Sequence, residues 1–174
     1  LRRLVHKVKP DILQGWMYHG NAAALAATYP APSQTLVLWN IRHSLYHIRH
    51  EKFITRSVIR ANRLTSAFPK RIIYNSKTSR KQHEDYGFRR ERGVLIPNGF
   101  DLTQFSPSAD QRRIVRSKYG IPEAAPLIGV FAHFHPMKGY EVVLEAAAIL
   151  KDTRPEFRLL LLGRRVDQTN RSLN

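Results

Sequence analysis

The chain of 174 residues contains no cysteine, which excludes disulfides, thiolate nucleophiles and zinc sites built on thiolates. It also lacks a run of the roughly 18 to 20 apolar residues that a membrane-spanning helix needs. The opening segment 1–5 has neither an initiator Met nor a secretory signal, so we expect a piece of a longer protein. Hydrophobic residues still make up 43% of the chain, and this content predicts a packed core in a soluble or peripheral protein.

Acidic partners are scarce around the histidines. Eight His are present, but His43 lies in an Arg-rich stretch where Glu51 is the nearby carboxylate. The sequence contains no Asp-x-Asp motif, which would hold a metal-bound diphosphate. We therefore expect no metal site.

Acidic residues are also few in the first part of the chain. Residues 1–98 carry 18 Lys and Arg against 5 Asp and Glu, whereas residues 99–174 carry 11 against 8. Such a basic field attracts phosphate-bearing partners, namely nucleic acid, an anionic membrane leaflet or a phospholipid-linked substrate. The alternative is a basic surface that is merely solvated.

Short apolar runs alternate with helical patterns along the chain. Strands are predicted over residues 12–18, 35–39, 71–75, 94–96, 126–132 and 157–162. Helices are predicted in the Ala-rich segment after Gly20 and over residues 51–67, 76–86, 110–119 and 139–151. This alternation indicates an α/β fold with parallel sheets covered on both faces, in which ligands bind at the carboxyl ends of the strands.

Two of these helices have apolar positions from which a buried face is predicted. In residues 51–67 the expected core stripe is Phe53, Ile54, Val58, Ile59, Ala61 and Leu64, with Arg on the other face. In residues 139–151 the expected inward positions are Val142, Val143, Ala146, Ile149 and Leu150.

The segment 127–139 is the most informative part of the sequence. A predicted strand ends in a loop that carries His133 and Lys138 just before a helix start at Gly139. A helix amino terminus offers free N–H groups and partial positive charge, and Lys138 adds a full charge. The pattern favours an anion site suited to a diphosphate, although an ordinary loop with an exposed Lys is the alternative.

A second motif precedes this segment and supports the first interpretation. Residues 94–101 read Val-Leu-Ile-Pro-Asn-Gly-Phe-Asp and are followed by Phe105-Ser106-Pro107. In this order, the two motifs resemble the inter-domain crossing and first strand–helix unit of the group 1 (family 4) glycosyltransferases, which have the GT-B fold. The resemblance extends through residues 14–19, 39–44, 72–76 and 160–170, and it is to the bacterial polysaccharide and lipopolysaccharide branch.

The resemblance implies two Rossmann-like domains, both incomplete in this chain. Residues 1–98 would be the latter half of the acceptor-side domain, and residues 99–174 the crossing segment and first part of the donor-binding domain. We expect this piece to be inactive alone.

The resemblance also implies roles for individual residues. Lys138, His133 and Gly139 would bind the donor diphosphate, and Asn98, Gly99 and Gly163 would contact the donor or line the cleft. His19 would be the catalytic residue of the cleft, Arg42 and Ser44 would bind the acceptor, and Ser76 would be a helix cap or a cleft residue. Two positions depart from the family pattern, because His133 replaces an Arg and Arg165 replaces a Gly.

The implied function is transfer of a sugar, with retention of configuration and without metal or cofactor, from a nucleotide-sugar to a cell-surface glycan or lipid-linked acceptor. The implied location is the cytoplasm, peripheral on the inner face of the bacterial cytoplasmic membrane, where the basic residues 51–67 would meet anionic lipid. Specific nucleic-acid partners are not expected.

Other functions remain open at this point. The protein could be a decayed, glycosyltransferase-like scaffold, as His133 and Arg165 suggest, or a basic nucleic-acid-binding domain. A nicotinamide-dependent enzyme is disfavoured because no Gly-x-Gly-x-x-Gly occurs in the chain.

Overall fold

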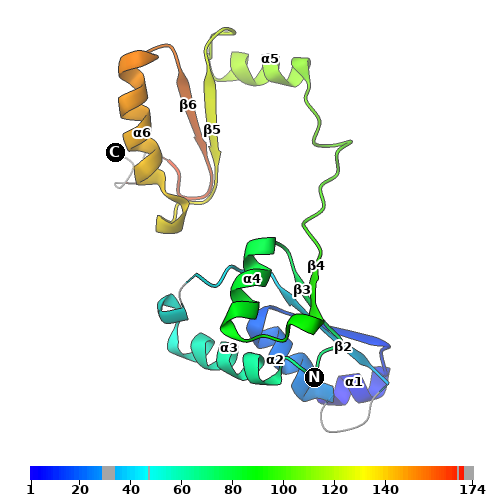
Figure 1. The fold of residues 1–174 in the computed structure, drawn as a ribbon. Helices are drawn as coiled ribbons and strands as arrows, with labels where there is room; N and C mark the ends of the chain where they lie inside the picture. The colour runs from blue at the N-terminus through cyan, green and yellow to red at the C-terminus, as the bar shows by residue number, and fades with distance from the viewer. Residues whose placement is uncertain (29–33, 47, 168, 171–174) are drawn as a thin grey trace. The chain divides into compact units, whose positions relative to one another are not determined.

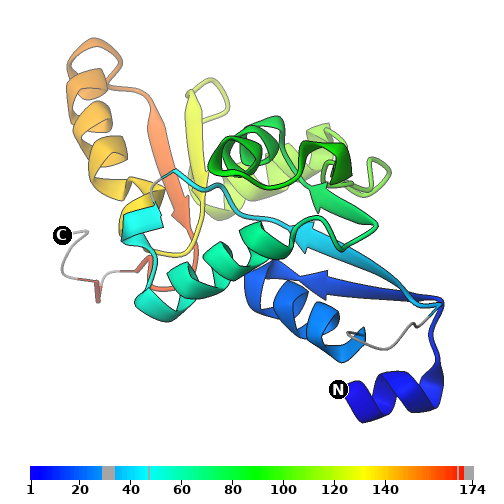
Figure 2. The same cartoon turned by 60° about the horizontal axis from the view of Figure 1, so that its bottom comes forward.

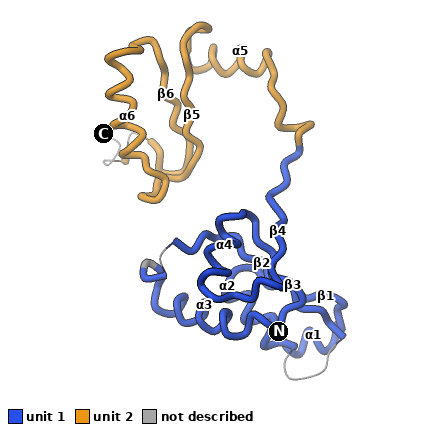
Figure 3. The backbone as a smooth tube through the Cα atoms, in the orientation of Figure 1, with its two compact units in different colours: residues 1–101 blue, residues 102–174 orange. Residues whose placement is uncertain are grey.

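The computed structural model describes residues 1–28, 34–46, 48–167 and 169–170. The chain divides into two compact units, Leu1–Asp101 (unit 1) and Leu102–Asn174 (unit 2), which are coloured separately in Figure 3. The α/β class predicted from the sequence is confirmed in both units, because each contains parallel strands joined through helices.

Unit 1 is built on a four-stranded parallel sheet with the order β1-β2-β3-β4 (Figure 1). Its strands are β1 (Ile12–Trp16), β2 (Leu36–Ile41), β3 (Arg71–Tyr74) and β4 (Gly93–Leu95). Its helices are α1 (Arg2–Val8), α2 (Met17–Thr28), α3 (Phe53–Thr65) and α4 (Lys77–Tyr86), with short turns η1 (Ile48–His50) and η2 (Arg90–Arg92). The carboxyl ends of all four strands therefore lie at one edge of the sheet.

The helices α2, α3 and α4 cover one face of this sheet, as the rotated view in Figure 2 helps to show. Strands that follow one another in spatial order through right-handed crossovers place their helices on the same side. On β2, Val37, Trp39 and Ile41 are buried, and they belong to the core that α2 and α3 complete. Ile12 and Leu36 stay exposed. The expectation of helices on both faces is therefore wrong for the described residues of unit 1.

A buried histidine links the helices in this core. The Tyr18 hydroxyl lies 2.7 Å from Nε2 of His83, and Nδ1 of His83 lies 2.7 Å from the carbonyl oxygen of Ser79. A neutral ring that donates from Nδ1 and accepts at Nε2 satisfies both contacts. Burial lowers the pKa of His83 to about 4, since the charged form would lose its hydration there. His83 is thus a structural, neutral histidine.

Acid should destabilise unit 1 through this residue. The unfolded chain takes up a proton on His83 near pH 6.5, whereas the folded chain does so only near pH 4. The contribution of His83 is therefore fully present above pH 6.5 and is lost as the pH falls towards 4. Between pH 7 and pH 5 we expect the free energy of unfolding to drop by about 2 kcal/mol from this residue.

Urea titrations of wild type and His83→Gln at several pH values measure this contribution. The difference between the two proteins in the pH dependence of the free energy of unfolding is the part due to His83. A matched His6→Gln variant, changed at an exposed position, should keep the wild-type pH dependence. A His83→Gln protein with the same pH dependence as wild type would contradict the assignment.

Unit 2 contains a β-α-β unit preceded by a helix. Its elements are α5 (Ala109–Lys118), β5 (Leu127–Phe131), η3 (Pro136–Lys138), α6 (Tyr140–Thr153) and β6 (Arg158–Leu162). The two strands pair in parallel, with Leu127 beside Arg158 and Phe131 beside Leu162. The carboxyl ends of β5 and β6 therefore carry neighbouring loops.

The buried faces of α3 and α6 differ from the sequence prediction. On α3, Ile59 and Asn62 are buried, whereas Phe53, Ile54 and Leu64 are exposed. On α6, Tyr140 is buried and Val143, Leu144, Ala147 and Leu150 are half-buried, whereas Val142, Ala146 and Ile149 are exposed. The exposed apolar positions on α3 leave an uncovered apolar surface on unit 1.

Candidate functional site

In unit 1 the end of β1 passes directly into α2 without the loop expected from the sequence. Met17 makes this turn with φ of 58°, in the left-handed region that costs most residues about 1–2 kcal/mol. Gly15 permits the close approach of α2, because a Cβ there would lie 2.6 Å from Cα of Asn21 and 2.7 Å from the carbonyl oxygen of Gly20. Such backbone outliers cluster at functional sites, which favours a site at this strand end.

His19 lies in the first turn of α2, with its side chain exposed. The sequence predicted a loop at this position, but the immediate start of α2 fixes His19 on helical backbone instead. The strand-end location expected for His19 is therefore present, while its local structure is not the expected one.

Arg42 follows β2 and contacts the ends of two other strands. Its guanidinium lies 5.3 Å from the ring centroid of Trp16, its backbone N–H donates to Sδ of Met17 at 3.4 Å, and its Nη2 donates to Oδ1 of Asn98. Trp16 is 55% exposed. The structure thus brings Arg42 and Asn98 together and adds Trp16, whose role the sequence did not indicate. An exposed indole beside a cation is a surface that can stack on an apolar ring face.

The segment after Arg42 is held by contacts to Glu51 and to α4. Nε2 of His43 lies 3.0 Å from Oε1 of Glu51, and the hydroxyl of Ser79 donates to the carbonyl oxygen of His43 at 2.6 Å. Ser44 is half-buried beside these contacts in the chain. Ser76 caps α4, since its hydroxyl accepts from the Ser79 N–H at 3.1 Å.

Asn98 and Gly99, which were predicted to form the crossing segment, are exposed and lie near the end of unit 1 at Asp101. A Cβ added to Gly99 would meet nothing within 4 Å, so packing within the described chain does not require this glycine. Asn98, in contrast, has a partner in Arg42.

In unit 2 the loop between β5 and α6 carries the residues predicted to bind the diphosphate, His133, Lys138 and Gly139. His133 is exposed, and its ring lies 5.8 Å from that of His135, which accepts a hydrogen bond from the Met137 N–H. The short turn η3 then presents exposed Lys138, and Gly139 turns the chain into α6 with φ of 64°. His133, Lys138 and the start of α6 are therefore parts of one loop.

Tyr140 fixes the base of this loop. It is buried, its hydroxyl donates to the carbonyl oxygen of Ala132 at 2.5 Å, and its ring packs against Phe134. The base of the loop is thus held by Tyr140, while the side chains of His133 and Lys138 are exposed to solvent.

Gly163, the first residue after β6, packs against the loop that follows β5. A Cβ at Gly163 would lie 1.7 Å from the carbonyl oxygen of Ala132, so no other residue fits without movement. The N–H groups of Ala132 and Phe134 donate to the carbonyl oxygens of Leu162 and Arg164 at 3.0 and 2.9 Å. Of the predicted donor residues, His133 therefore lies beside Gly163, since a Cβ at Gly163 would also lie 3.0 Å from the backbone nitrogen of His133.

Arg165 lies in the left-handed region with φ of 63°. Glycine adopts this conformation without a steric cost. The position at which Arg replaces a family Gly is thus one whose backbone favours Gly.

Neither a metal-ligand cluster, among the residues that the structure describes, nor the cavity beside α4 lies at these loops. Across the described ranges, no three His, Asp or Glu side chains gather as they would around a metal ion. A cavity of about 510 Å³ lies beside α4 and is lined by Leu45, Tyr46, Ile48, Arg49, Gln82, Asp85 and Tyr86.

Residues 1–104 match the sequence model of Glycosyltransferase Family 4, which is more than half of the chain. The chain belongs to glycosyltransferase family 4. The match covers all of unit 1, including the strand ends that carry His19, Arg42 and Asn98.

Curated relatives resemble parts of this glycosyltransferase chain. A putative glycosyltransferase, EpsF of Bacillus subtilis, is 38% identical over 74 residues, which are 42% of this chain and 19% of EpsF. The D-inositol 3-phosphate glycosyltransferase of Streptomyces avermitilis is 33% identical over 102 residues, which are 58% of this chain and 22% of that protein. The chain thus spans about a fifth of the length of the curated relatives that it matches.

Solved structures confirm the GT-B type of fold for the chain. HepE of Anabaena, crystallised in complex with UDP and glucose, superposes with a TM-score of 0.74 at 20% identity over 91% of this chain and 41% of HepE. A UDP-GlcNAc 2-epimerase from Neisseria meningitidis superposes with a TM-score of 0.55 at 12% identity, over 99% of this chain and 47% of that chain. At these identities the likeness concerns the fold.

Proposed function

We propose that the protein carrying this chain transfers a sugar from a nucleotide-sugar to a cell-surface glycan or lipid-linked acceptor, with retention of anomeric configuration and without metal or cofactor. The observation that carries the proposal is the loop after β5, which presents Lys138 beside the start of α6 in a family 4 chain. HepE, which shares the fold, is described with UDP and glucose bound, and this supports a nucleotide-sugar as donor.

In this proposal unit 2 is the donor-binding side. When the bond between the anomeric carbon and the diphosphate breaks, negative charge grows on the leaving nucleotide. Lys138 and the free N–H groups of α6 would stabilise that charge, in the place that a metal ion takes in other enzymes. His133 and Gly139 would contact the same diphosphate, and Gly163, which lies against Ala132, would contact the donor or line the cleft.

Unit 1 is then the acceptor side. His19 on the first turn of α2 would contact the transferred sugar or orient the acceptor hydroxyl. Arg42 and Ser44 would bind the acceptor, with Trp16 beneath the Arg42 guanidinium. Asn98 and Gly99 would contact the donor or line the cleft.

The membrane forms part of the proposal, with a cytoplasmic protein held on the inner face of the bacterial membrane. Support comes from the excess of Lys and Arg in residues 1–98 and from the anionic surface of that leaflet. No helix among the described residues has the length and apolar character needed to cross a bilayer.

A panel of nucleotide-sugars, offered to the intact protein, tests the transferase function. We expect slow hydrolysis of one donor, a rate unchanged by EDTA, and a product of retained configuration in proton NMR. A rate abolished by EDTA would contradict metal independence. If wild type hydrolyses no donor but His133→Arg does, the protein is a decayed enzyme. If neither protein hydrolyses a donor, the result contradicts the transferase function.

A further inference from the structure

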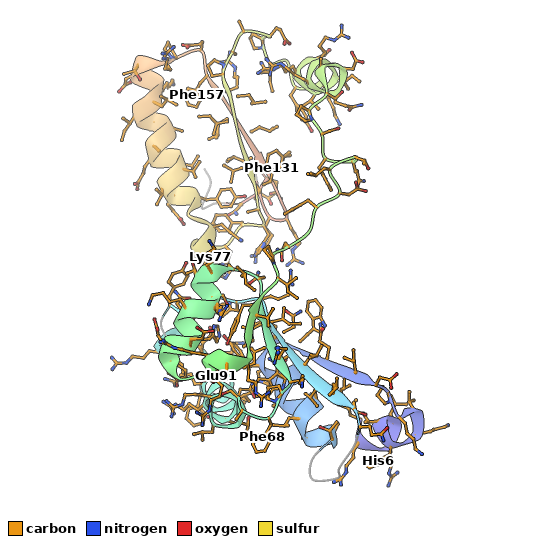
Figure 4. All side chains as sticks on the ribbon, turned by 45° about the vertical axis from the view of Figure 1, so that its right-hand side comes forward. His6, Phe68, Lys77, Glu91, Phe131 and Phe157 are labelled. Carbon is orange, nitrogen blue, oxygen red and sulfur yellow. The ribbon has the colours of Figure 1, made fainter. Side chains whose placement is uncertain are left out.

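The outward face of α3 carries large apolar side chains. Phe53, Ile54 and Leu64 are 71%, 70% and 74% exposed, whereas Ile59 and Asn62 on the opposite face are buried. At 3.6 residues per turn, Phe53 and Leu64 fall on one line along the helix, three turns apart. Figure 4 shows Phe68, itself 60% exposed, at the surface of unit 1 beyond the end of α3.

Cations flank these apolar side chains. Lys52 and Arg60 are exposed, and Arg56 lies with its guanidinium 5.8 Å from the ring centroid of Phe53. No Asp or Glu occurs between Glu51 and Glu84. We call Phe53, Ile54, Leu64, Lys52, Arg56 and Arg60 the α3 surface.

This combination selects among possible partners. Nucleic acid would use the cations but would leave Ile54 and Leu64 in water, and an apolar protein face would not need the cations. A bilayer with anionic lipid satisfies both, because apolar side chains enter the boundary of the acyl chains while Lys and Arg remain among the phosphates. Charge complementarity therefore points to an anionic lipid surface.

We propose that α3 lies in the plane of an anionic bilayer, with Phe53, Ile54 and Leu64 inserted among the lipids. The inference deepens the membrane part of the proposed function, on which it rests, because it replaces attraction by charge alone with insertion of named side chains. Its signature is a binding component that salt does not screen.

Sedimentation of the intact protein with vesicles tests the proposal. The vesicles are phosphatidylcholine alone or phosphatidylcholine with phosphatidylglycerol, at low and high salt. We expect Phe53→Ser/Leu64→Ser to lower the partition coefficient about tenfold at both salt concentrations. Arg56→Gln/Arg60→Gln should lower it about tenfold at low salt, and much less at high salt.

Control variants separate insertion of the α3 surface from a general effect of exposed apolar side chains. Ile149→Ser, which removes an equally exposed apolar side chain of unit 2, should bind like wild type, and so should the apolar swap Phe53→Leu/Leu64→Met. Wild-type binding by Phe53→Ser/Leu64→Ser would overturn the proposal. A lower melting temperature of Phe53→Ser/Leu64→Ser with unchanged vesicle binding would also overturn the proposal. In that case the outward face of α3 would be covered by protein rather than by lipid. Donor hydrolysis without vesicles should be equal in all variants, so loss of the transferase activity and loss of membrane insertion are scored separately.

Discussion

Lys138→Ala should lower kcat/KM for hydrolysis of the nucleotide-sugar about a hundredfold. Removing one donor aimed at developing charge costs on the order of 100- to 1,000-fold in well-ordered sites. Lys138 is an exposed side chain at the end of η3, so its removal should leave the fold intact. Steady-state hydrolysis by the intact protein measures the effect, and the loss should fall mainly on kcat, because the charge grows in the transition state.

The matched control is Lys151→Ala, which removes an exposed Lys from the last turn of α6, the helix that follows η3. It should retain wild-type kcat/KM, since it lies at the far end of α6. Lys138→Arg should recover part of the activity, because it keeps the charge. Equal rates for Lys138→Ala and Lys151→Ala would remove Lys138 from the donor site.

Gly163→Ala should unfold unit 2 or lower its free energy of unfolding by about 4 kcal/mol or more, an exceptional value for one methyl group. The added Cβ would lie 1.7 Å from the carbonyl oxygen of Ala132 and 2.4 Å from its carbonyl carbon. These are backbone atoms, so no side-chain rotation relieves the clash. The two hydrogen bonds between the loops after β5 and β6 would have to break to admit it.

Arg165→Gly in the same loop should act in the opposite direction. It relieves a left-handed φ of 63° and should raise the free energy of unfolding by about 1 kcal/mol. Urea titrations followed by circular dichroism compare the two variants with wild type. A Gly163→Ala protein as stable as wild type would contradict the close contact with Ala132.

The order and type of the elements could be predicted from the sequence because each apolar run is short and bounded. The predicted strand 71–75 and helix 76–86 correspond to β3 and α4. Ser76 caps that helix, which is one of the two roles expected for it, and Gly87 ends the helix in a left-handed conformation. Local signals of this kind depend on a few neighbouring residues.

Which face of each helix is buried could not be predicted as reliably as the order of the elements. In α3 and α6 apolar residues occur on more than one side, so periodicity alone admits several buried faces. Asn62 is buried on α3 because its side-chain amide donates to the carbonyl oxygen of Tyr18 at 2.8 Å, a tertiary contact without a local signal. The polar residue thus takes the buried place that Leu64 was expected to take.

The sequence predicted that the site residues follow separate strands. The structure adds the contacts between these residues. The contact of Arg42 with Trp16 and Asn98 joins residues from three strand ends and depends on the register of the sheet. Met17 carried no sign of a left-handed turn, because Met there is not a residue that favours it. Arg165 is likewise left-handed, at a position where the family pattern has a Gly.

The pairing of the two loops in unit 2 also bears on how this protein can change over evolution. New substrate preferences often come from loops that lengthen or shorten independently of one another. Here the Ala132 and Phe134 N–H groups are bonded across to Leu162 and Arg164, and Gly163 fits against Ala132 without space to spare. An insertion in either loop would break the hydrogen bonds that join it to the other loop. Diversification at this end of the sheet is therefore restricted to exchanges of side chains, such as the His at position 133, on a backbone of fixed length.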